Sequence, residues 1–122
     1  MPAGEYLSPA DLAALDVTIR KAEQLCRAEF SVFVGRVQGD DARRFALGLH
    51  RMLVLPDRTI LVMVDPTAQR AEVVTGERVR SRLSDAQAQH ALEPMVEILR
   101  GGDLVGGLTH GIQQLAEHAR TQ

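Results

Sequence analysis

Three arginines at every second position lie within VVTGERVRSRLSD, residues 73–85, and their spacing is the first feature of the chain that suggests chemistry. Ser84 follows them at a predicted helix start, where free backbone amides favour anions. Guanidinium groups beside such a start could bind phosphate or another anion. The candidate anion-binding residues are Arg78, Arg80, Arg82 and Ser84. The alternative is a solvated polar corner in which the arginines pair with Asp57, Glu77 and Asp85 and add little stability.

A second group of charged residues is acidic and consists of Asp40, Asp41 and Asp65. Each follows a predicted strand, and the carboxyl ends of parallel strands are a common ligand position in α/β sheets. Their oxygens could suit a hard cation. The sequence favours a simpler interpretation, in which Asp40 caps a helix and Asp65 forms a turn.

Other catalytic patterns are absent from the sequence. The four histidines, at positions 50, 90, 110 and 118, have neither H-x-E nor H-E-x-x-H spacing, so they are not predicted to bind a metal. Cys26 is the only cysteine, and its place in an apolar helical stripe predicts a buried thiol. There is no G-x-S-x-G elbow and no Walker-type glycine loop.

The composition is that of an ordinary globular domain. The chain has 122 residues, 45% of them apolar and 25% charged, and a formal net charge of −2. A slightly acidic chain with 3% aromatic residues does not suit nucleic acid. No apolar run is long enough to span a bilayer and no signal peptide is evident, so a cytoplasmic location is expected. Residues 1–7 are predicted to be a flexible lead and 8–122 one domain.

The elements that position these residues follow from caps and hydrophobic periodicity. Helix starts are predicted at Ser8, Asp40, Ser84 and Asp103, and Pro94 is predicted to bend or split the third helix. The stripe of the second helix is expected to end with Met52 or Leu53 buried. Strands are predicted in the segments EFSVFVGRV, TILVMV and RAEVVT.

The order α-β-α-β-β-α-α predicts a three-layer α/β/α domain with a small mixed sheet centred on TILVMV. The first two strands should be parallel, and the tight connection DPTAQ makes the next pair antiparallel. This topology places Asp57 near Gly76 and Asp85 on one rim of the sheet. The predicted core residues of the strands are Val32, Val34, Ile60, Val62 and Val64.

Four motifs in this order resemble the TPM domain family over roughly residues 8–118. YLSPADLAAL resembles its opening helix, LPDRTILVMV its corner and strand, VVTGERVRSRLSD its glycine stretch, and RGGDLVGGLTHGIQQL its closing helix. The form without a signal peptide or a membrane segment resembles the uncharacterised actinobacterial members. The resemblance implies a layered α/β fold. Among TPM domains, calcium binding is associated with some members, acid phosphatase activity with a plant member, and accessory roles in membrane assemblies with others.

The chain departs from the family pattern at the glycine stretch. The first family glycine matches Gly76, whereas the second matches Arg78 and the family glutamate matches Arg80. Asp57 and Asp85 remain as candidate metal ligands, with calcium as the cofactor that the resemblance implies. Nearby guanidinium groups oppose a divalent cation, so the sequence predicts a polar corner without a tight calcium site, and no cofactor.

Two functions are therefore weighed. The first is a non-catalytic interaction or accessory module, related to a membrane assembly and peripheral to the membrane, with an unknown protein partner. The second is a weak metal-dependent hydrolase of the acid-phosphatase type. The altered glycine stretch favours the first. The partner and the oligomeric state are not determined by the sequence.

Overall fold

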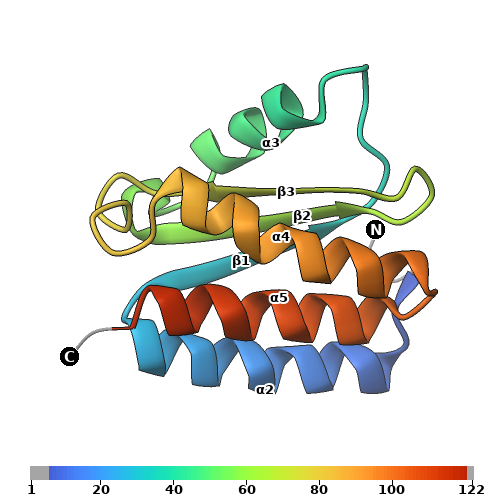
Figure 1. Ribbon diagram of the computed structural model, residues 1–122, viewed down its shortest axis with the longest axis horizontal. Helices are drawn as coiled ribbons and strands as arrows, with labels where there is room; N and C mark the ends of the chain where they lie inside the picture. Colours follow the sequence, from blue (N-terminus) through green and yellow to red (C-terminus); the bar gives the residue numbers. More distant parts are fainter. Residues whose placement is uncertain (1–5, 121–122) are drawn as a thin grey trace.

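A three-stranded sheet forms the middle layer of the structure, a computed structural model that describes residues 6–120 (Figure 1). Its elements follow the predicted order. In chain order they are α2 (Pro9–Cys26), β1 (Glu29–Val34), α3 (Ala42–Arg51), the 3₁₀ turn η1 (Pro56–Arg58), β2 (Thr59–Asp65), β3 (Arg70–Thr75), α4 (Asp85–Arg100) and α5 (Leu104–His118). The predicted three-layer α/β/α fold is confirmed.

The sheet has the order β1-β2-β3 and the predicted mixed topology. Strand β1 pairs with β2 in parallel, with Glu29 opposite Thr59, and β2 pairs with β3 in antiparallel, with Ile60 opposite Thr75. Every residue of the central strand β2 is buried. Strand β1 lies in the middle layer, as predicted, but at an edge of the sheet. Its residue Val32 is therefore only half-buried, whereas Val34, Ile60, Val62 and Val64 are buried as predicted.

The two faces of the sheet are covered unequally. Helices α2, α5 and α4 cover one face, with α5 between the other two, and α3 alone covers the other face (Figure 1). The larger core lies on the three-helix side and includes Ile60, Val62, Met95 and Ile112. The smaller core lies under α3, where Leu61, Met63 and Val74 meet Ala46 and the half-buried side chains of α3. The strand residues alternate between the two cores, as period-two side-chain geometry requires.

The helix starts come from local side-chain caps. Ser8 with Asp11, and Ser84 with Gln87, form reciprocal capping boxes, and Asp103 accepts from the Gly106 amide at 2.8 Å. The predicted cap of α3 is wrong by one residue. Asp41, not Asp40, accepts from the amide three residues on, that of Arg44, at 3.0 Å.

Helix α4 runs without a break from Asp85 to Arg100 with Pro94 inside it, so the predicted split of this helix is wrong. Proline removes one helical hydrogen bond, which leaves the carbonyl of His90 without its usual donor. His90 and Pro94 are both exposed, so a water molecule can donate to the His90 carbonyl in place of the missing amide. The buried residues Leu92 and Met95 lie on either side of Pro94, and their packing holds the two halves in one helix.

The predicted N-terminal lead, residues 1–7, falls largely outside the described residues. Of its two described residues, Leu7 is buried in the larger core and the Tyr6 hydroxyl lies 3.5 Å from the Thr67 hydroxyl. The structured domain therefore already includes Leu7.

Candidate functional site

The corner predicted from the topology is present at one rim of the sheet. The Gly76 amide donates to the Thr59 carbonyl and the Arg78 amide to the Asp57 carbonyl, both at 3.0 Å. The Thr75 hydroxyl lies 3.5 Å from a carboxylate oxygen of Asp85. The turn η1, the end of β3 and the start of α4 therefore meet here, as expected (Figure 1).

The three arginines of this corner have different surroundings. Residues 77–82 form successive turns, so the every-second-residue spacing does not place their side chains along one edge as it would in a strand. The Arg82 guanidinium donates to the carbonyls of Cys26 and Ala119, at the ends of α2 and α5. The Arg80 side chain donates to the Thr75 carbonyl at 3.3 Å, and Arg78 is exposed beside η1.

The alternative prediction, a salt-bridged corner, is wrong for the part of the chain that the structure describes. No ion pair there joins Arg78, Arg80 or Arg82 to Asp57, Glu77 or Asp85. The Ser84 hydroxyl accepts from the Gln87 amide at 3.2 Å and serves as a helix cap. Anion binding at Arg78, Arg80, Arg82 and Ser84 stays a prediction, although Arg82 and Ser84 already have intramolecular partners.

The acidic residues are similarly dispersed. Across residues 6–120, no three His, Cys, Asp or Glu side chains are grouped so that they could hold a metal ion. Asp57 is exposed on η1, and Asp85 contacts Thr75. At the opposite rim, Asp41 caps α3 and Asp65 is buried, so two of the three acidic residues there have structural roles.

Asp65 joins three segments of the chain at the opposite rim. It is 3% exposed, and its carboxylate accepts from the Val37 amide at 3.0 Å and the Ala68 amide at 3.1 Å. Arg70 lies 3.6 Å away. Burial of Asp65 opposes ionisation, but the two amides and the Arg70 charge outweigh it and hold the pKa of the carboxyl below its ordinary value. The predicted turn at Asp65 is confirmed by the Ala68 contact.

We expect Asp65→Asn to lower the free energy of unfolding at pH 7 by about 2 kcal/mol, because one charge-assisted amide contact is lost. A lowered folded-state pKa stabilises the fold above pH ~4 and ceases to do so as the pH falls through the folded-state value. The variant should therefore lose less stability than the wild type between pH 7 and pH ~3. Urea unfolding at both pH values measures this, with exposed Asp57→Asn as the control. Parallel acid profiles for wild type and Asp65→Asn would contradict the assignment.

Cys26 and the four histidines, all within residues 6–120, do not come together as a catalytic group. Cys26 is fully buried, as predicted, and burial raises the pKa of its thiol. His50 is buried, with its Nε2 3.0 Å from the Thr59 carbonyl. The other three histidines, His90, His110 and His118, lie on α4 and α5 and are half-buried or exposed.

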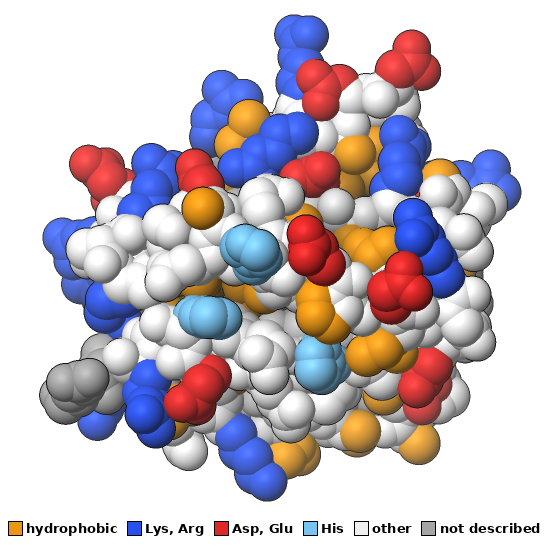
Figure 2. All heavy atoms as spheres, in the orientation of Figure 1, with side chains coloured by type: hydrophobic (Ala, Val, Ile, Leu, Met, Phe, Trp, Pro, Cys, Tyr) orange, Lys and Arg blue, Asp and Glu red, His pale blue; other side chains and the backbone are white. Residues whose placement is uncertain are grey.

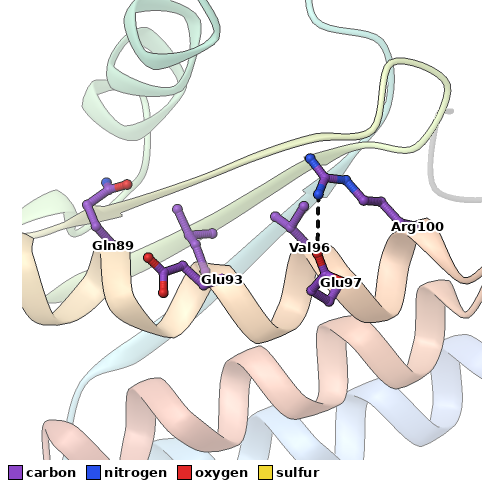
Figure 3. Close-up of a pocket in the computed structure, with 6 residues that line it drawn as sticks. Gln89, Glu93, Val96, Glu97 and Arg100 are labelled. Carbon is purple, nitrogen blue, oxygen red and sulfur yellow. Dashed lines mark hydrogen bonds and ion pairs between the residues drawn. The ribbon is translucent and has the colours of Figure 1, made fainter.

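A shallow hollow of about 400 Å³ lies along α4 and is lined by Gln89, Leu92, Glu93, Val96, Glu97 and Arg100 (Figure 3). All six residues come from one helix, so the hollow has no second wall that could enclose a substrate. Arg100 pairs with Glu97 at 3.2 Å, within the helix itself. This hollow is a feature of the helix surface and not an active site.

The segment directly after α3 in the chain forms an exposed apolar surface that the sequence interpretation missed. Met52, Val54 and Leu55, here called the apolar tip, are 84%, 95% and 46% exposed, respectively. Leu53, between them, packs against the smaller core. Of the two residues proposed to complete the buried stripe, Leu53 is therefore the one that packs. Met52 is exposed because α3 ends at Arg51 and the chain leaves the helical phase there. The only signal in the sequence was the apolar run MLVL between Arg51 and Arg58.

Three arginines adjoin the apolar tip. Arg51 precedes it, and Arg58 and Arg78 line a hollow of about 350 Å³ together with Val54 and Leu55. Pro56 and Asp57 complete the lining. Basic side chains gather along the left edge of Figure 2, where Figure 1 places the turn after β3. The apolar tip and these arginines are the candidate functional site, called the tip surface below.

The fold and this site define a small α/β domain with an exposed apolar and basic end. The chain belongs to the DUF5130 family, a domain of unknown function, whose model matches residues 3–116. The predicted membership of the TPM family is therefore wrong, because the matching family model is DUF5130 and no match to a TPM domain is shown. The proposed resemblance to the uncharacterised actinobacterial TPM members is therefore not supported either.

Two solved structures share the fold. One is the BA42 protein of the psychrophilic bacterium Bizionia argentinensis, with a TM-score of 0.82 and 17% identity over 93% of this chain and 81% of that chain. The other is the N-terminal domain of a P. gingivalis protein, with a TM-score of 0.70 and 19% identity over 93% of this chain and 76% of that chain. At these identities the likeness establishes the fold alone.

Proposed function

We propose that this protein is a non-catalytic interaction module that docks through the tip surface, in the cytoplasm and at the periphery of the membrane. The observation that carries the proposal is the exposure of Met52 and Val54, at 84% and 95%, beside arginines of the tip surface. Exposed apolar side chains that adjoin one another mark interaction sites more often than scattered ones do. Within residues 6–120 no helix is long and apolar enough to cross a membrane.

The hydrolase alternative has no observation in its favour. It came with the TPM resemblance, which the family match overturns. The candidate ligands Asp57 and Asp85 are not part of any three-residue metal group in the described chain. The interaction module is therefore the function that the geometry supports best.

Photo-crosslinking in cells tests the proposal without assuming the partner. A photoreactive amino acid is placed at position 54 of the tip and, in a matched control, at position 17 of α2. Val17 is also apolar and is 49% exposed, but it lies on the outer helical layer away from the tip. We expect covalent adducts, with protein or lipid, at position 54 in at least about tenfold excess over position 17, because a specific docking contact is local. Equal yields at the two positions would contradict the proposal.

A further inference from the structure

We propose that the tip surface docks on an anionic phospholipid bilayer, with Met52 and Val54 entering the interface and the surrounding arginines contacting lipid phosphates. This inference rests on the proposed function and names the partner of the same surface. It is carried by the apolar tip and by the charge around it.

The apolar tip has the form of an inserting loop. Leu53 fixes the loop to the smaller core while Met52 and Val54 project from it. The Met52 amide donates to the Leu49 carbonyl at 3.1 Å, and the Leu53 amide to the His50 carbonyl at 3.2 Å. Unsatisfied backbone groups are the main obstacle to placing a loop in an apolar medium. Two donors of this loop, the Met52 and Leu53 amides, are already satisfied within the fold, which lowers the cost of moving the loop out of water.

The charge around the tip is complementary to anionic lipid. The segments 51–58 and 76–78 carry three arginines, namely Arg51, Arg58 and Arg78. Their acidic residues are two, Asp57 and Glu77. The whole chain has a formal net charge of −2, so the rest of the molecule is clearly acidic and is repelled by an anionic surface. Charge alone therefore orients the protein with the tip surface toward such a bilayer.

The shape of the tip favours a bilayer over a protein groove. Val54 is 95% exposed and projects beside a shallow hollow that Arg58 and Arg78 line together with Leu55, Pro56 and Asp57. A bilayer interface accepts projecting aliphatic side chains without a matching pocket, and its phosphates lie at the level where the flanking arginines would be. A protein partner is the alternative outcome of the test.

The test is co-sedimentation of the purified chain with vesicles at about 0.1 M salt, where surface charge is partly screened. One set contains phosphatidylglycerol and phosphatidylcholine, the other phosphatidylcholine alone. We expect the wild type to bind the anionic set at least about tenfold more tightly than the neutral set. Val54→Asp should weaken that binding about tenfold or more. Arg58→Gln and Arg78→Gln should weaken it about fivefold each.

Matched controls carry the same chemical changes elsewhere. Val17→Asp and Arg20→Gln alter α2 residues, and both positions are exposed. They should leave vesicle binding unchanged within about twofold, since they alter net charge equally but lie away from the tip. Equal losses in the control and tip variants would overturn the inference, and so would a wild type that binds neither vesicle set. Protein adducts at position 54 in cells, without vesicle binding, would overturn this inference while the proposed function stands.

Discussion

Replacing Gly76 with alanine is expected to lower the free energy of unfolding by about 3 kcal/mol or more, at the upper end of what overpacking usually costs. A Cβ at this position would lie 2.2 Å from the Pro56 carbonyl oxygen and 2.3 Å from that of Asp57. Both obstacles are backbone atoms, so no side chain can rotate away to make room. The added methyl group must push η1 away from β3 and disturb the Arg78 amide contact with Asp57.

Urea unfolding followed by circular dichroism measures this change, and Gly48→Ala is its control. Gly48 lies inside α3, and a Cβ built there meets nothing within 4 Å. Alanine in an exposed helix interior is favoured over glycine by about 0.5–1 kcal/mol, so the control should be more stable than the wild type. If Gly76→Ala were as stable as the wild type, the close approach of η1 to Gly76 would be wrong.

Gly76→Ala also tests whether the geometry of this corner matters for vesicle binding. Arg58 and Arg78 flank the apolar tip from the two segments that Gly76 holds together. Displacing η1 should therefore weaken vesicle binding as well as stability, even at a temperature where Gly76→Ala is still folded. Gly48→Ala should leave binding unchanged, because it alters neither segment.

The fold could be predicted because local signals agreed with it. Ser8, Ser84 and Asp103 are caps whose hydrogen bonds depend only on nearby residues, and the uninterrupted apolar run of β2 predicts a central strand. The Asp57–Gly76 contact followed from topology, since antiparallel pairing fixes which strand ends meet. These predictions needed no knowledge of long-range side-chain contacts.

The family assignment failed because the motifs used for it have structural explanations in this fold. In RGGDLVGGLTHGIQQL, Asp103 is a helix cap, and the last two glycines permit close packing of α5 on α4. A Cβ at Gly107 would lie 2.8 Å from the Leu99 side chain, and one at Gly111 would lie 2.5 Å from the Met95 sulfur. A domain with these helix contacts needs small residues at these positions whatever its family. Such motifs indicate architecture better than ancestry.

The candidate site was the part least accessible from sequence. Spacing alone placed Arg78, Arg80 and Arg82 in one group, whereas the turns of residues 77–82 separate them. The apolar tip was assigned in part to the core, because nothing in the helical pattern shows where α3 ends. Both errors concern the direction of side chains at element ends, where periodicity no longer applies.

Arg82→Met is expected to lower the free energy of unfolding by about 2–4 kcal/mol, since part-buried charge-assisted hydrogen bonds to two carbonyls are lost together. The Arg82 guanidinium donates to the carbonyl of Cys26, the last residue of α2, and to that of Ala119, at 2.6 Å, just after α5. Carbonyls at helix ends have no helical donor and carry the negative end of the helix dipole. Methionine keeps the apolar stem but supplies neither donor nor charge.

The control is Arg80→Met, which removes a neighbouring exposed arginine whose side chain donates a hydrogen bond to the Thr75 carbonyl at 3.3 Å. It should cost less than about 0.5 kcal/mol, as is usual for surface substitutions. Thermal and urea unfolding of both variants measure the difference, and phosphate titration by NMR adds a second readout. A structural Arg82 predicts a large loss of stability for Arg82→Met, whether or not phosphate binds. A fully stable Arg82→Met that loses a phosphate response seen in the wild type would instead restore Arg82 to the predicted anion site.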